Sequence, residues 1–271
     1  FLGLRNLDVI DKAVELVGGV DIGTLPLDEA QTYAMLARGD STGVFQFESS
    51  GMRDALRAVK PTVFEDLIAL VALYRPGPMQ YIPTYAARKN GKEAVAFLDQ
   101  RLKEITGETY GICIFQEQYM QISKLLAGFE PAEAETLRRA IGKKIHELMA
   151  SLKPKFLDGC ARNGVPPAVA DQLWKDMESS QDYSFNKAHA ACYALIAYRT
   201  AWLKANHPCE YMAALISSVM NTKDRVPIYV NACDEMGIDV LPPDVNESDV
   251  DFAVRSGKIR FGLNAVKNVG E

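Results

Sequence analysis

The sequence lacks the features of membrane, secreted and low-complexity proteins. Its longest apolar run, Leu67 to Tyr74, has eight residues, whereas a membrane-spanning helix needs about 20. The five cysteines are odd in number and far apart along the chain, which argues against a disulfide framework and against a zinc knuckle. Glycine and proline occur at ordinary frequencies, 19 and 13 residues, which excludes collagen-like and low-complexity chains. We therefore expect no membrane association.

Several catalytic motifs are also missing. The chain has three histidines, His146, His189 and His207, and none belongs to an HExxH motif, so we expect no zinc site built by this chain. There is no GxGxxG motif after an apolar strand pattern and no Walker-type phosphate loop. Two isolated acids, Glu48 and Asp66, are interpreted as surface or helix-capping residues.

What the sequence contains is typical of a folded globular protein. Of its 271 residues, 48% are apolar and 24% are charged, and this length corresponds to about two domains, or one large domain with a satellite. The formal net charge of −5 gives no sign of a polyanionic partner, so any nucleic-acid role must depend on local charge. The chain has no initiating methionine and no signal peptide features, and we expect a piece of a longer cytosolic protein.

Hydrophobic periodicity predicts a mainly α fold. The Arg75-Pro76-Gly77-Pro78 sequence predicts a stiff loop, and residues 42–47 are interpreted as a short strand or an extended turn. From Gly237 onward, three short apolar runs at 238–241, 252–254 and 259–261 predict strands joined by turns, and so a small strand-containing C-terminal segment. Helices are predicted at 6–17, 28–37, 50–58, 63–74, 91–106, 116–127, 132–152, 168–179, 189–206 and 210–220.

Positive charge is concentrated in residues 136–163, which hold seven basic residues and two acidic ones. On a helix that begins near Pro131, Arg139 and Lys143 are i,i+4 neighbours, and like charges this close repel unless an anion lies between them. A guanidinium beside an ammonium suits a phosphate group. A charge run is more commonly a solvated helix face, so both interpretations stay open at this point.

A second dense segment, Tyr183 to His189, combines aromatic rings, an amide, a cation and an imidazole. These side chains are used to stack on a base or sugar and to contact phosphate. The same residues also suit a helix N-terminus at which Asn186 caps the backbone and Phe185 packs on the core. Neither alternative is favoured by the residues alone.

Seven phrases in one order closely resemble the alpha subunits of bacterial DNA polymerase III, the C-family replicative polymerases, over essentially the whole chain. Two positions depart from the usual pattern, Ala188, where serine is commoner, and Cys192, where alanine is commoner. The phrases are FLGLRNLDVID at Phe1, GVFQFESSGM at Gly43, ALYRPGPM at Ala72, FQEQYMQI at Phe115, LRRAIGKK at Leu137, SFNKAHAACYALIAYRTAWLKANHP at Ser184 and LPPDVNES at Leu241.

This resemblance implies the C-terminal edge of a palm domain at 1–20, a helical fingers domain at 21–236, and a short-strand segment at 237–271 that leads toward a helix-hairpin-helix and clamp-binding region. It implies a DNA-directed DNA polymerase whose fingers position the incoming dNTP and the primer-template. The palm aspartates that hold Mg²⁺ would lie outside this chain, so we expect the piece alone to be inactive. The implied partners of the whole protein are the sliding clamp and other replicase subunits.

The resemblance also implies roles for individual residues. Arg75 and Lys144 match positions of possible DNA or domain-junction contact, with a structural role slightly favoured for Arg75. An error-prone C-family paralogue and a non-catalytic helical scaffold remain alternative interpretations. The residues that match nucleotide-binding positions are Arg138, Arg139, Lys143, Tyr183, Asn186, Lys187 and His189.

Overall fold

A computed structural model describes residues 5–182, 184–222, 224–266 and 269. The chain divides into two compact units, one made of residues 1–64 and 194–271 and the other of residues 65–193. The boundaries fall inside α4 (Phe64–Leu73) and α11 (Lys187–Asn206), so each of these helices contributes residues to both units. Within the described residues, no helix has the length and apolar character to cross a membrane.

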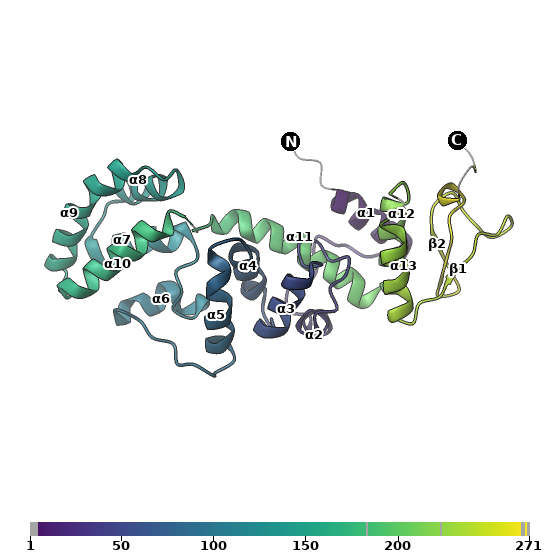
Figure 1. The fold of residues 1–271 in the computed structure, drawn as a ribbon, viewed down its shortest axis with the longest axis horizontal. Helices are drawn as coiled ribbons and strands as arrows, with labels where there is room; N and C mark the ends of the chain where they lie inside the picture. Colours follow the sequence, from purple (N-terminus) through teal and green to yellow (C-terminus); the bar gives the residue numbers. More distant parts are fainter. Residues whose placement is uncertain (1–4, 183, 223, 267–268, 270–271) are drawn as a thin grey trace. The chain divides into compact units, whose positions relative to one another are not determined.

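The first unit is organised around α12 (Pro208–Val219), a helix that is buried along most of its length. The apolar face of α1 (Arg5–Val17) carries Val9, Ile10 and Ala13 into the same core as Met212 and Ile216 of α12. α12 also packs against α13 (Val226–Glu235), and Figure 1 shows these helices side by side. The helical periodicity predicted at 6–17 and 210–220 is therefore confirmed, whereas α13 was not predicted.

α2 (Ala30–Arg38) and α3 (Ser50–Val59) form a packed pair in the same unit. The Glu29 carboxylate caps α2 by accepting hydrogen bonds from the amides of Gln31 and Thr32, and Gly39 ends the helix at a φ of 75° that suits glycine. The segment between the helices, interpreted from sequence as a strand or an extended turn, is a pair of turns in which Val44 donates to Ser41 and Phe47 to Val44.

The C-terminal segment forms a three-stranded sheet with the order β1-β3-β2. β1 (Val240–Leu241) pairs in parallel with β3 (Lys258–Arg260), and β2 (Ala253–Arg255) pairs antiparallel with β3. Ser256 and Gly257 connect β2 to β3 with positive φ angles of 52° and 74°, the geometry of a tight hairpin turn. The three predicted strands are confirmed, and so is the mainly α fold with a small strand-containing C-terminal segment.

The second unit contains a four-helix group with its own core. These helices are α7 (Gln116–Ala127), α8 (Pro131–Gly142), α9 (His146–Arg162) and α10 (Pro167–Ser180), drawn in teal and green in Figure 1. Their shared core includes the fully buried rings of Phe156 and Trp174, whose centroids are 5.2 Å apart. α9 crosses α7 so closely that a Cβ at Gly159 would lie 2.0 Å from the carbonyl oxygen of Ala127.

The rest of the second unit consists of α4 and several short elements. α5 (Ile82–Lys89) follows the 3₁₀ turn η1 (Pro78–Tyr81). The Asp66 carboxylate, interpreted from sequence as a surface or capping group, is instead fully buried, where it pairs with Lys89 at 3.2 Å and accepts a hydrogen bond from Tyr85 at 3.0 Å. This ion pair joins α4 to α5.

Two predicted helices are wrong in extent. The helix predicted at 91–106 is reduced to the short turns η2 (Gln100–Leu102), α6 (Lys103–Thr106) and η3 (Gly107–Thr109), and residues 93–97 are irregular. The helix predicted at 132–152 is broken between α8 and α9. Lys144 adopts a left-handed φ of 54° and donates to Ile141, while Ile145 donates to Ala140, the two hydrogen bonds of a Schellman helix end.

Candidate functional site

A backbone bridge brings two distant phrases of the sequence together in the second unit. The amide of Phe185 donates to the carbonyl oxygen of Ile114 at 3.1 Å, and the amide of Gln116 donates to the carbonyl oxygen of Phe185 at 3.0 Å. Phe115 directly precedes α7, and Phe185 stands two residues before α11. The segment from Ser184 to His189 therefore lies at the N-terminal end of α7.

Glu117, in the first turn of α7, holds this segment in place. Its two carboxylate oxygens accept hydrogen bonds from Asn186 Nδ2 at 2.8 Å and from the backbone amide of Lys187 at 3.0 Å. Asn186 Oδ1 in turn accepts from the backbone amide of His189 at 2.8 Å, which is the geometry of a helix N-cap. The capping role expected as one alternative for Asn186 is therefore confirmed.

Lys187 and His189 lie beside the same bridge. The Lys187 ammonium is 2.5 Å from Glu108 Oε1 and 5.7 Å from the ring centroid of Phe115. The His189 ring is exposed, with its centroid 5.5 Å from that of Phe185 and 4.6 Å from that of Tyr193. The start of α11 thus presents a cation and an imidazole next to three aromatic rings.

Arg75 approaches the segment from the other end of the unit's sequence. Its guanidinium lies 4.2 Å from the centroid of the Phe185 ring, within cation–π range, and Arg75 Nε donates to the carbonyl oxygen of Ala72 at 2.9 Å. Burial lowers the pKa of the guanidinium. These contacts are internal to the protein, which agrees with the structural role slightly favoured from sequence.

Arg138 connects α8 to the same place. Arg138 Nε and Nη2 contact the two oxygens of Glu135 at 2.9 and 2.6 Å, and Arg138 Nη1 donates to Gln116 Oε1 at 3.4 Å. The hydrogen bonds with Glu135 raise the pKa of Arg138 and lower the pKa of the carboxyl. The backbone amide of Gln116 also donates to the carbonyl oxygen of Phe185. Arg138 therefore contacts a residue that takes part in the bridge.

Three cations near the C-terminal end of α8, Arg139, Lys143 and Lys144, are exposed. Lys144 pairs with Asp182 at 3.0 Å, whereas the side chains of Arg139 and Lys143 make no hydrogen bond with any residue that the structure describes. Although α8 ends at Gly142, the amide of Lys143 still donates to Arg139 at 3.0 Å, so the predicted i,i+4 spacing is kept. Tyr183, the remaining candidate, lies outside the described residues.

The structure therefore gathers Arg75, Arg138, Asn186, Lys187 and His189 around the Phe115–Phe185 bridge. Arg139, Lys143 and Lys144 extend from the C-terminal end of α8. Three residues that bind this arrangement together, Glu108, Gln116 and Glu117, were not singled out by sequence reasoning. Gln116 and Glu117 belong to the quoted phrase FQEQYMQI, which is the only signal that pointed to them.

Comparison with protein-family models shows which family the chain belongs to. Residues 6–164 match the model of the bacterial DNA polymerase III alpha subunit finger domain. The chain belongs to this family. Residues 237–271, which contain the small sheet, match a helix-hairpin-helix motif model. Two different family models therefore match separate parts of the chain.

Three curated relatives of this chain share the name DNA polymerase III subunit alpha. It is 47% identical over 281 aligned positions to the DNA polymerase III subunit alpha of Mycobacterium tuberculosis, 48% to that of Thermus aquaticus and 44%, over 279 positions, to that of Aquifex aeolicus. Each comparison covers 100% of this chain, but only 23–24% of the relative. The chain thus spans about a quarter of the length of these relatives.

Proposed function

We propose that this chain is the fingers portion of a replicative DNA-directed DNA polymerase and that it positions the incoming dNTP and the primer-template for nucleotidyl transfer. The observation that carries the proposal is the bridge between Phe115 and Phe185, since it places the start of α11 at the end of α7 that Arg138 reaches through Gln116. Two phrases that resemble nucleotide-binding parts of polymerases thereby come into one region.

In this proposal the exposed cations at the end of α8 bind the triphosphate. Arg139 and Lys143 are solvent-exposed and unpaired within the described part of the chain, so their donors are available to an oxyanion, and such an oxyanion would relieve the repulsion between them. Arg138 is already oriented by Glu135 and Gln116. A preoriented guanidinium stabilises developing phosphate charge without reorganisation.

The start of α11 would contact the sugar and base of the nucleotide. Asn186 and Lys187 are fixed by Glu117 and Glu108, while the exposed His189 ring offers a face for packing. Tyr183 belongs to the same proposed group on the basis of its sequence position. Arg75 and Lys144 are proposed to contact DNA or a neighbouring domain of the polymerase.

The chain's own residues do not fit a metal-binding role. Among the described residues, no group of three or more histidine, cysteine, aspartate or glutamate side chains could hold a metal ion. In this proposal, palm aspartates of the full-length polymerase that lie outside this chain hold Mg²⁺. Residues 1–20 are proposed as the palm edge and 21–236 as the fingers, with 237–271 leading toward regions that bind DNA and the sliding clamp.

The test is a kinetic comparison of two arginine variants in the full-length polymerase that carries this segment. Arg139→Ala removes an exposed cation of the proposed site, and Arg162→Ala removes one from the last turn of α9. We expect Arg139→Ala to raise the KM for dNTP or to lower kcat by about tenfold or more, as loss of a charge-assisted phosphate contact does. Arg139→Lys should restore part of this loss.

The control variant Arg162→Ala should keep the kinetics of the unmodified enzyme. If Arg139→Ala also kept them, Arg139 would have no role in nucleotide binding. Salt dependence adds a second measure, because binding of DNA or triphosphate by several cations weakens steeply as ionic strength rises. Binding of a partner without such dependence would favour a scaffold role instead.

A further inference from the structure

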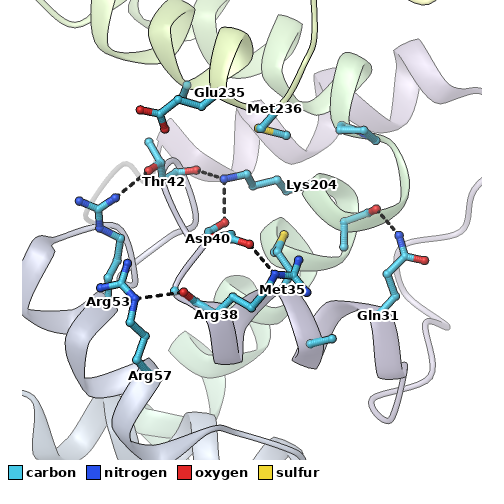
Figure 2. Close-up of a pocket in the computed structure, with 15 residues that line it drawn as sticks. Gln31, Met35, Arg38, Asp40, Thr42, Arg53, Arg57, Lys204, Glu235 and Met236 are labelled. Atoms are coloured by element: carbon cyan, nitrogen blue, oxygen red, sulfur yellow. Dashed lines mark hydrogen bonds and ion pairs between the residues drawn. The ribbon is translucent and has the colours of Figure 1, made fainter.

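A pocket of about 570 Å³ opens in the first unit, separate from the residues of the proposed nucleotide site. It lies between α2, α3, the end of α11 and α13, and Figure 2 shows its side chains. The volume falls within the range of about 300–1,000 Å³ that small-molecule sites occupy. Four cations, Arg38, Arg53, Arg57 and Lys204, line it against two carboxylates, Asp40 and Glu235.

Three of these four cations already have partners in the protein. Arg38 Nε contacts Asp40 Oδ2 at 2.7 Å, and Arg57 contacts Asp54 at 2.8 Å and the carbonyl oxygen of Arg38 at 3.0 Å. Lys204 is almost completely buried, and its ammonium donates to the carbonyl oxygens of Asp40 and Thr42, both at 2.8 Å. These contacts fix the wall of the pocket.

Arg53 differs from the others because its hydrogen-bonding capacity is not met. The one hydrogen bond of its side chain within the described structure joins Nη1 to Thr42 Oγ1 at 3.3 Å, and its Nε is buried without any acceptor. A buried donor that lacks an acceptor destabilises the protein unless a ligand supplies one. Arg53 also lines an adjoining pocket, in which Arg225 is accompanied by the carboxylates of Glu48 and Glu235, so the cations outnumber the carboxylates only in the first pocket.

We propose that this pocket binds a phosphate group, with Arg53 as its central ligand. Asp54 already offsets the charge of Arg57, whereas the Arg53 guanidinium forms no ion pair with the described residues. A planar guanidinium with free donors matches phosphate oxygens. The phosphate group belongs either to a small molecule in solution or to a nucleic-acid backbone. The proposal does not depend on the proposed nucleotide site, which lies in the other unit.

The test uses the 271-residue chain and two probes, inorganic pyrophosphate and a 12-residue oligothymidylate. Binding is followed by NMR of the arginine Nε–H resonances and by titration calorimetry. We expect the Arg53 Nε–H resonance to shift with at least one probe, and Arg53→Gln to weaken binding to this pocket about tenfold. Glu235→Gln should strengthen it several-fold, because the Glu235 carboxylate lines the same pocket and opposes an anion.

Arg5→Gln serves as the control, since Arg5 is an exposed arginine of the same unit that does not line the pocket. A response to pyrophosphate identifies a small-molecule source, and a response to oligothymidylate alone identifies a nucleic-acid backbone. The proposal is overturned if the Arg53 resonance stays unchanged with both probes, or if Arg53→Gln and Arg5→Gln weaken binding equally. The NMR measurement needs only the unmodified chain, so a poorly folded variant cannot hide the outcome.

Discussion

Glu117→Gln tests whether the hydrogen bonds between Glu117 and the start of α11 position the proposed nucleotide site. The Glu117 carboxylate accepts two hydrogen bonds, one from Asn186 Nδ2 and one from the Lys187 amide. A glutamine at this position has one oxygen and one NH₂ group, and that NH₂ group would face the NH₂ group of Asn186. Rotation of the Asn186 amide would only move the conflict, because Asn186 Oδ1 already accepts from the His189 amide.

The expected cost follows from this conflict. In the two-oxygen arrangement that the structure shows, one charge-assisted hydrogen bond is lost and the other becomes a neutral one, which amounts to about 1–2 kcal/mol. In the 271-residue chain, the backbone amides of Lys187 and His189 should exchange with solvent roughly tenfold faster. In the full-length polymerase, the KM for dNTP should rise by a similar factor, with a smaller change in kcat.

Glu104→Gln is the matched control, because Glu104 is exposed on α6 and has no partner among the described residues. If both variants showed the same amide exchange at Lys187 and His189, Glu117 would not hold the segment. If Glu117→Gln accelerated this exchange but left the KM for dNTP unchanged, the segment would be held by Glu117 without taking part in nucleotide binding.

Two further predictions concern stability. Gly159→Ala should lower the unfolding free energy measured in urea by about 2–3 kcal/mol, because the added Cβ would collide with the backbone of Ala127. Gly107→Ala should not lower it, because no atom lies within 4 Å of its Cβ position. Equal stabilities of the two variants would mean that α7 and α9 can move apart freely. Burial lowers the pKa of Lys204 to about 8, below its unfolded value of about 10.4, so between these values Lys204 binds more protons in the unfolded chain. Its contribution to the unfolding free energy should therefore rise by about 2 kcal/mol from pH 7 to pH 10. Burial raises the pKa of thiols such as Cys233, which act in the opposite sense, so the rise is measured as the difference between the unmodified chain and Lys204→Met. Lys204→Met should lack this rise, and parallel pH profiles of the two proteins would contradict the reasoning.

Helices were predictable where one apolar face repeats along an uninterrupted segment. α1, α7 and α10 fit this description, and their bounds agree with the predicted ones to within one residue. The break at Lys144 was missed because it arises from a left-handed residue that is not glycine, which local sequence rarely reveals. α5 was missed because Pro83, its second residue, reads in sequence as the end of a helix, although proline is also compatible with the first turn.

The candidate site was predictable in its parts, while its assembly was not. The sequence pointed to Arg138, Asn186 and Lys187 through their chemistry and the segments they belong to. The glutamates that bind them have no sequence feature that marks them as partners. Glu117 is 69 residues before Asn186, and Glu108 is 79 residues before Lys187. Pairings at this separation depend on tertiary packing, so periodicity and composition do not contain them.

The bridge between Phe115 and Phe185 also has a consequence for the order of folding. It closes a loop of about seventy residues that contains α7, α8, α9 and α10 with their own apolar core. Contacts between neighbours in sequence form sooner than contacts across a long loop. These four helices should therefore pack on one another before the Phe115–Phe185 bridge forms. The residues of the proposed nucleotide site would then be the last to reach their places, and a substitution that weakens the four-helix core should first disturb the assembly of that site.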